Sequence, residues 1–319
     1  MKQSVIFHVL FLFFCITPTA GATEISEGDA AFARKNYAAA LELYSQARQN
    51  QNDHNWKRLT IQIVRCCLAQ GKTERAVQEY FLLCRVDPAP PLEWIPLPWF
   101  VPIETATGRG LREKNAENWL DPLQTKSPNL AATLLAAATL SVSPDSAKQL
   151  RGYQLLRNLA KALETSETSS TSPKTPESQE SAAQHHLQHH VALLATALCW
   201  KQRIPTLKKQ SAQNQSAQNQ SPLTPLRRIL DQIPEPYQAG PLFLFGQAAR
   251  IVGDHETAVL TWMRIPILYS ENVPLSIEAL GEAALSLEKL GRFDQAKQLQ
   301  TERLRLKNNL DRKQNSQPH

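Results

Sequence analysis

The chain has 319 residues, a formal net charge of +6 and a hydrophobic share of 42%. That apolar share is enough for a folded core, which excludes wholesale disorder. With only 5 cysteines and 11 glycines, the disulfide-scaffold and collagen-like classes are excluded as well. At about 150 residues per domain, the length allows two domains or one elongated array.

The N-terminal segment, residues 1–22, has the layout of a secretory signal peptide. Lys2 supplies a positive charge, Val5 to Ile16 form an apolar core, and small residues lead up to Ala22. A membrane-spanning helix needs about 20 apolar residues, so this core is too short to remain in a bilayer. We expect cleavage after Ala22, a periplasmic or secreted mature chain, and no integral membrane segment after cleavage. An uncleaved anchor is the alternative.

Export places the remaining cysteines in a compartment that permits disulfides without requiring them. Two interpretations stay open for Cys66, Cys67 and Cys84. Either Cys66 or Cys67 pairs with Cys84 across a helix hairpin, or all three are small buried apolar side chains. The absence of Cys-x-x-Cys spacing argues against a zinc ribbon or a thioredoxin-type site.

Similar helix–turn–helix segments occur as two pairs, in residues 23–88 and 239–308. Ala76 follows Ala40 by 36 residues, and Ala296 follows Ala258 by 38. We expect these alanines to let two helices approach closely, and the aromatic residues to fill space between adjacent hairpins. The residues that define the repeats are Gly28, Ala40, Tyr44, Gly71, Ala76, Tyr80, Gly246, Gly253, Ala258, Trp262, Gly291 and Ala296.

These segments resemble tetratricopeptide repeats of the exported bacterial type, whose period is about 34 residues. Val64 departs from the pattern where a small residue is typical, and Gln300 departs from it where an aromatic is typical. A terminal repeat is expected to be atypical because it caps the array. The resemblance implies an all-α fold, an α-solenoid of stacked helix–turn–helix units with a helical middle region.

Stacking of this type implies that the first helices line a concave face that binds a protein or peptide. A carboxylate clamp of the family uses Lys and Asn in a first helix, where this chain has Ile25 and Asp29. We therefore do not expect binding of chaperone C-terminal carboxylates. The partner-binding positions that the resemblance implies are Gln62, Arg65, Phe243, Gln247, Arg250, Glu278 and Glu282.

The residues between the two repeat pairs are less regular. Residues 89–128 form a connector rich in Pro and Trp, and we expect its tryptophans to pack onto the second repeat. A ligand for a groove that reads polyproline is the alternative. Residues 129–238 are a helical middle region with disordered loops at 165–181 and 204–222, and 309–319 are a disordered tail. Whether the middle region continues the solenoid or forms a separate domain stays open.

The chemistry-bearing motifs are few. His185 and His189 are four residues apart on one helix face, which suits a transition metal, but no fourth ligand is evident beside them. No Gly-rich phosphate loop, His-Glu-x-x-His or Gly-x-Ser-x-Gly element occurs in the sequence. We expect no cofactor, no metal and no catalysis.

Our leading hypothesis is an exported scaffold that holds a protein or peptide partner in the bacterial cell envelope, with no nucleic acid involved. A second hypothesis is an enzyme or enzyme accessory in envelope polymer metabolism, which requires a convergent polar cluster within residues 109–203. A third is a structural spacer without a specific ligand. The partner's identity and the oligomeric state are left open by the sequence.

Overall fold

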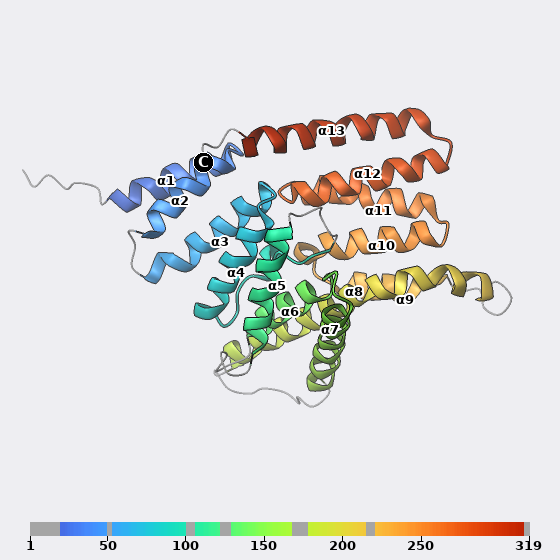
Figure 1. The fold of residues 1–319 in the computed structure, drawn as a ribbon, viewed down its shortest axis with the longest axis horizontal. Coiled ribbons are helices and arrows are strands. Elements are labelled where there is room, and N and C mark those ends of the chain that lie inside the picture. Colours follow the sequence, from blue (N-terminus) through green and yellow to red (C-terminus); the bar gives the residue numbers. More distant parts are fainter. Residues whose placement is uncertain are drawn as a thin grey trace, which may run out of the picture.

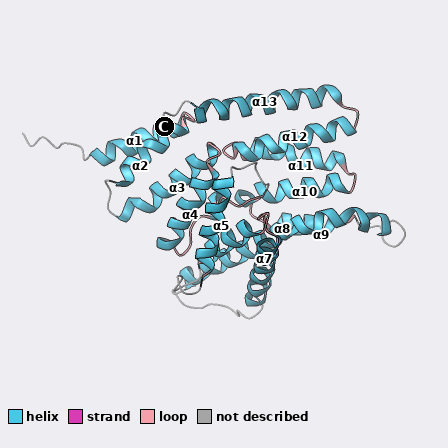
Figure 2. Ribbon diagram, in the orientation of Figure 1, coloured by secondary structure: helices cyan, strands magenta, loops and turns pink. Residues whose placement is uncertain are grey.

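The computed structural model describes residues 20–49, 53–99, 106–121, 129–167, 178–214 and 221–315. Within these ranges all regular structure is helical, and no strand is present (Figure 2). The elements are α1 (Ala20–Ala33), α2 (Tyr37–Gln49), α3 (Asp53–Ala69), α4 (Thr73–Val86), η1 (Leu92–Trp94), α5 (Ala106–Leu120), α6 (Leu130–Leu140), α7 (Ser146–Glu167), α8 (Ser178–Asn214), α9 (Thr224–Gln232), η2 (Glu235–Tyr237), α10 (Ala239–Ile251), α11 (His255–Leu268), α12 (Val273–Lys289) and α13 (Phe293–Asn315).

Each helix packs against the next one along the chain, so the prediction of an all-α fold is confirmed. The pairs α1/α2 and α3/α4 form one stack of hairpins, and α10/α11 and α12/α13 form another. In Figure 1 the helices α10 to α13 lie one above the other, beside the α1–α4 stack. The two stacks also touch directly, because α3 contacts α12.

All four hairpins close with the same turn. A residue with positive φ ends the first helix, and the N–H of the following residue bonds to the carbonyl five positions back at 2.9 Å. This is the Schellman motif, which satisfies carbonyls that a helix end otherwise leaves unpaired. The positive-φ residues are Lys35 (58°), Gly71 (68°), Gly253 (90°) and Gly291 (72°).

The alanine that recurs in the sequence occupies the same place in each hairpin. Its N–H bonds to the carbonyl of the residue directly after the positive-φ position, at 3.0 to 3.1 Å. Each of these alanines is 2% exposed or less, because the neighbouring helix passes over it. The four are Ala40, Ala76, Ala258 and Ala296. The repeat found in the sequence is therefore also a repeat in backbone geometry.

The large aromatic of the second helix fills space inside its own hairpin, whereas we expected it between adjacent hairpins. A Cβ on Gly28 would lie 2.7 Å from the Tyr44 ring, and one on Gly246 would lie 2.5 Å from Trp262. In each hairpin the glycine precedes the aromatic by 16 residues. The absence of a side chain at this position is what admits the ring.

The middle helices do not form a separate core. Helix α6 is almost entirely buried between α5, α7 and α8, and α8 in turn packs on α10. One cluster of buried apolar side chains runs from Ala31 in α1 to Ala283 in α12. The middle region thus connects the two hairpin stacks through continuous packing.

Several helix boundaries differ from our expectations. Helix α8 continues through residues 204–214, and α7 and α13 extend into the predicted loop 165–181 and tail 309–319. Pro205 lies inside α8, and Ile204 (6% exposed) and Leu207 (3%) are buried on either side of it. Residues 168–177, 215–220 and 316–319 of these loops and tail lie outside the described residues.

The described structure begins near the expected cleavage point. Helix α1 starts at Ala20, so Ala22 lies in its first turn, and the rest of the predicted signal segment lies outside the described residues. Across the ranges that the structure describes, no helix combines the length and apolar character needed to cross a membrane.

The shared turn can be tested at the first hairpin, where Lys35 occupies the positive-φ position that glycine occupies in the other three. Lys35→Gly should raise the free energy of unfolding by about 0.5–1 kcal/mol, because an L side chain at positive φ is strained. Gly253→Ala should lower it by about 1 kcal/mol for the same reason. Urea unfolding followed by circular dichroism measures both. Ala39→Gly in α2 is the control, since its site is helical and the substitution should destabilise; stabilisation there would contradict the explanation.

Candidate binding site

A strap formed by residues 88–99 crosses from the first hairpin stack to the second. The Tyr80 hydroxyl donates to the Pro91 carbonyl at 3.1 Å, and the Lys201 ammonium donates to the Pro98 carbonyl. Trp99 packs so closely on α10 that a Cβ on Gly240 would lie 2.0 Å from its ring. Burial lowers the pKa of Lys201 to about 7.

The burial of the strap decides between the two roles that the sequence left open for it. Trp94 does pack on the second repeat, through Arg65 of α3, whereas Trp99 packs on α10 of the other stack. Pro96 and Pro98 are buried, so they are not available to a groove that reads polyproline. Phe100 lies outside the described residues.

The strap meets a second short proline-flanked segment, η2, at the centre of the molecule. The Tyr237 hydroxyl is hydrogen-bonded to the Glu93 carboxylate, and burial together with this carboxylate raises the pKa of Tyr237. On its other side, the Tyr237 ring lies 5.1 Å from that of His190 in α8. The hydrogen bond between Tyr237 and Glu93 therefore links η2 to η1.

Arg65 joins the two stacks. Its guanidinium carbon lies 4.5 Å from the centre of the Phe32 ring and 4.4 Å from that of Trp94. One terminal nitrogen donates to both carboxylate oxygens of Glu271 at 3.1 Å, and the other donates to the Gln62 side chain at 3.1 Å. A planar cation suits both kinds of partner, because its faces stack on rings while its edge donates.

A cleft of about 480 Å³ opens beside this arginine. It lies among α3, η1, η2 and the turn between α11 and α12, and its size is typical of ligand sites. Its lining contains three carboxylates and one guanidinium, which gives a formal charge of −2. The lining residues are Arg65, Leu68, Glu93, Trp94, Glu235, Pro236, Ala239, Leu268, Tyr269, Ser270, Glu271 and Asn272.

Of the seven partner-binding positions that we expected, only Arg65 lines this cleft. Phe243 is 2% exposed and packs near Trp262, and Arg250 pairs with Glu282 at 2.8 Å. Gln62 bonds to Arg65, while Gln247 and Glu278 are half-buried. Two of the first helices, α3 and α10, each contact a third, α12.

The cleft residues on η1, η2 and the α11–α12 turn were missed by the sequence analysis. A usable signal was present: Glu93 with Trp94, and Glu235 with Tyr237, each place an acid and an aromatic inside a proline-flanked segment. We treated the first segment only as a connector and the second only as the approach to the repeats.

The histidine pair that we considered for a metal lies in the N-terminal half of α8. His185 is exposed and His189 is half-buried at the start of α8. His190 is the histidine with a shifted pKa, lowered by burial and by His189 and His186. Among the described residues, no three side chains of His, Cys, Asp or Glu come together to hold a metal ion.

The four cysteines of the described residues are free, so of the two interpretations left open for Cys66, Cys67 and Cys84 the structure has the buried side chains and not the disulfide. Cys66 and Cys67 lie near the α3–α4 turn, whereas Cys84 lies at the far end of α4. In an antiparallel hairpin this separates them by about 12 Å along the axis, beyond the reach of a disulfide. Burial raises the pKa of Cys66 and Cys67 to about 12, which keeps both thiols protonated.

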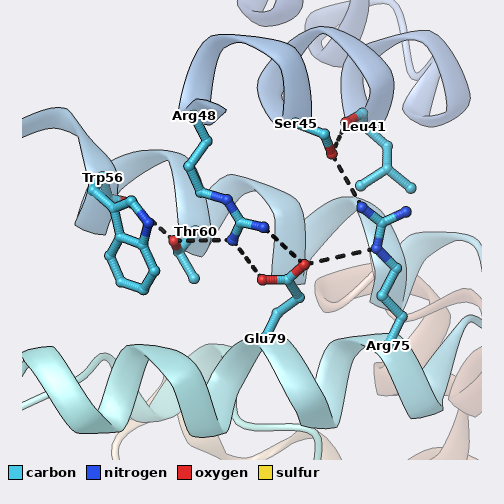
Figure 3. Close-up of polar contacts among 7 residues, drawn as sticks. All are labelled: Leu41, Ser45, Arg48, Trp56, Thr60, Arg75 and Glu79. Carbon is cyan, nitrogen blue, oxygen red and sulfur yellow. Dashed lines mark hydrogen bonds and ion pairs between the residues drawn. The ribbon is translucent and has the colours of Figure 1, made fainter. Parts of the chain in front are cut away.

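A buried ion-pair network locks the first repeat to the second (Figure 3). Glu79 of α4 is 6% exposed and accepts two hydrogen bonds from Arg48 of α2, at 2.5 and 3.1 Å. Arg75 lies 3.7 Å from the same carboxylate and donates to Ser45 at 3.1 Å. Thr60 of α3 completes the contact by meeting Arg48 at 3.3 Å.

Within residues 109–203, where an enzymatic hypothesis requires a polar cluster, an ion-pair group is present on α5 and α7. Lys148 of α7 lies 3.3 Å from Glu113 and 3.0 Å from Glu117, both on α5. These two carboxylates raise the pKa of Lys148, so the amine stays charged. A charged amine held by two carboxylates ties α7 to α5.

Comparison with known proteins adds no family name. No family model matches this chain, and no curated protein matches it.

A double-mutant cycle tests whether Arg65 and Glu271 join the stacks. Arg65→Ala and Glu271→Ala should show a coupling free energy of about 1–2 kcal/mol, because the charge-assisted contact is half-buried and the guanidinium lies against two rings. Denaturant unfolding of the wild type, both single variants and the double variant gives this value. A coupling below about 0.5 kcal/mol, typical of exposed pairs, would contradict the assignment.

The Glu79 network predicts a second, larger effect. Glu79→Ala should lower the free energy of unfolding by about 3 kcal/mol, because Arg48 and Arg75 lose a buried counter-charge. Glu79→Gln keeps hydrogen-bonding atoms in place and should cost less. Gln78→Ala, one residue earlier and exposed, is the matched control and should change stability by less than about 0.5 kcal/mol. Equal effects at both positions would argue against the network.

Proposed function

We propose that this chain is an exported scaffold of tetratricopeptide type that binds a protein partner in the bacterial cell envelope and carries out no catalysis of its own. The observation that carries the proposal is the repeated hairpin: four units close with one turn geometry and stack in two pairs around a cleft. Stacked helical hairpins present extended surfaces, and such surfaces suit protein recognition.

The assignment to the tetratricopeptide type rests on agreement between period and packing. Intervals of 36 and 38 residues are close to the family's period of about 34. A glycine in the first helix receives the aromatic of the second in two hairpins, and a buried alanine follows every turn. The first and second pairs of repeats meet where Arg65 of α3 binds Glu271 of the α11–α12 turn.

A binding role is favoured over that of a spacer by the organisation of the cleft. Its walls come from four separate parts of the chain, and its position is held by Arg65, Glu271 and the Tyr237–Glu93 bond. Preorganised concave sites with a few fixed polar groups are typical of ligand recognition. A spacer does not require them.

Export is tested by the fate of residues 1–22. We expect the full-length chain, expressed with a C-terminal tag in a Gram-negative bacterium, to appear in the periplasmic fraction with Thr23 as its N-terminus. Deletion of residues 1–22 should retain it in the cytoplasm. N-terminal sequencing and fractionation measure both, and a full-length chain found in the cytoplasm would overturn the export part of the proposal.

Partner binding is tested with a complex reconstituted from purified proteins. The mature chain, cross-linked in native envelopes, should yield a partner that can be purified separately and that co-elutes with it at fixed stoichiometry in size-exclusion chromatography. A variant carrying Glu79→Ala, which weakens the packing of the first two repeats, should lose part of this binding. If no envelope protein forms a stoichiometric complex, the scaffold proposal fails and the spacer hypothesis replaces it.

A further inference from the structure

We propose that the cleft among α3, η1, η2 and the α11–α12 turn takes a lysine or arginine side chain from an amphipathic segment of the partner, whose apolar side chains lie along α11. This inference rests on the proposed scaffold function and specifies the chemistry of the partner.

The charge of the cleft selects a cation. Glu271 is neutralised by Arg65, and this leaves Glu93 and Glu235 as the uncompensated charges of the lining. Both of these residues are exposed, on η1 and η2 respectively. A basic side chain entering between them gains two favourable charge interactions, and an acidic one meets two unfavourable interactions.

The shape and walls of the cleft suit a long cationic side chain. Trp94 and Tyr269 supply aromatic surface, and Leu68, Ala239 and Leu268 supply aliphatic surface. Lysine and arginine pack their stems on apolar walls while their charged heads reach polar groups. Cations are also attracted to the faces of aromatic rings. About 480 Å³ exceeds the volume of one such side chain, so adjacent backbone of the partner also fits.

An exposed apolar stripe leads to the mouth of the cleft. Leu260 (71% exposed) and Ile267 (68%) are seven residues apart on one face of α11, and Leu268 (47%) continues to the cleft lining. Large aliphatic side chains gathered on one helix face mark contact surfaces. Arg264 lies between Leu260 and Ile267 on this face, so we expect a neutral or acidic partner residue opposite it.

The probe is a fluorescein-labelled decapeptide of alternating leucine and lysine, added to the mature chain at low salt. Fluorescence anisotropy should give saturable binding, and the same peptide with glutamate in place of lysine should bind at least tenfold more weakly. Binding should weaken as salt rises. Equal affinity for the two peptides would overturn the proposal.

Three variants test separately the charge of the cleft, its open volume and the apolar stripe on α11. Glu93→Gln with Glu235→Gln should weaken binding of the lysine peptide five- to tenfold. Ser270→Trp, which fills the cleft without changing charge, should weaken it at least as much. Leu260→Ser with Ile267→Ser should weaken it severalfold. Thermal unfolding should be unchanged for Ser270→Trp and for Leu260→Ser with Ile267→Ser, since these side chains are exposed. Glu93→Gln keeps an acceptor oxygen for the Tyr237 hydroxyl, so the Glu93/Glu235 variant should unfold cooperatively like the wild type.

The matched control is Glu288→Gln with Asp294→Asn. It removes the same charge from exposed positions at the opposite end of α12 and the start of α13. Its affinity for the lysine peptide should equal that of the wild type. A loss equal to that of the Glu93/Glu235 variant would show that net charge alone attracts the peptide, and the cleft assignment would be wrong.

The same variants distinguish this inference from the scaffold proposal. If an envelope partner binds the wild type and the Glu93/Glu235 variant equally, the scaffold stands and the cleft is not its site. If no envelope partner binds while the lysine peptide still binds with the expected variant pattern, the cleft assignment stands and the scaffold proposal fails.

Discussion

The guanidinium of Arg65 holds the two hairpin stacks together. It is stacked between Phe32 of the first repeat and Trp94 of the strap, and it bonds to Glu271, 206 positions later. Each of these contacts brings another segment to the same point: α1, η1 and the turn before α12. The cleft exists because these segments converge without filling the space between them. A side chain that presents two flat faces and a donor edge is well suited to such a junction, and lysine has no equivalent geometry.

Around that junction, the structure repeats one local solution four times. The same turn and the same buried alanine appear in all four hairpins, and the same glycine-to-aromatic contact appears in two of them. Polar contacts then differentiate the repeats. The first two are cross-linked by Glu79 with Arg48 and Arg75, whereas the last two are joined by Arg250 with Glu282. Repetition builds the stacks, and the individual ion pairs fix how they meet their neighbours.

The fold class was predictable because its signal is local. Spacing of alanine, glycine and aromatic residues within some 40 positions reports directly on hairpin geometry. The candidate site was not predictable in the same way, since Arg65, Glu93, Glu235 and Glu271 come together only through tertiary packing. Arg65 was singled out by its place on a first helix, but as a residue facing a partner and not as one bound within the chain. The loop expected at 204–222 was wrong over residues 204–214 for a related reason: Ile204 and Leu207 are buried by tertiary packing, which local composition does not report.

The contact between the two hairpin stacks has a consequence for how this protein can change over evolution. Linear repeat arrays gain and lose units easily, because each unit contacts only its neighbours. Here the number of units is constrained, since an inserted hairpin would carry Glu271 away from Arg65 and unstack Trp94. The same closure raises the mean sequence separation of contacting residues, which slows folding relative to an open array and makes the two stacks unfold together. Repeat number should therefore stay fixed while the sequences of the individual repeats vary.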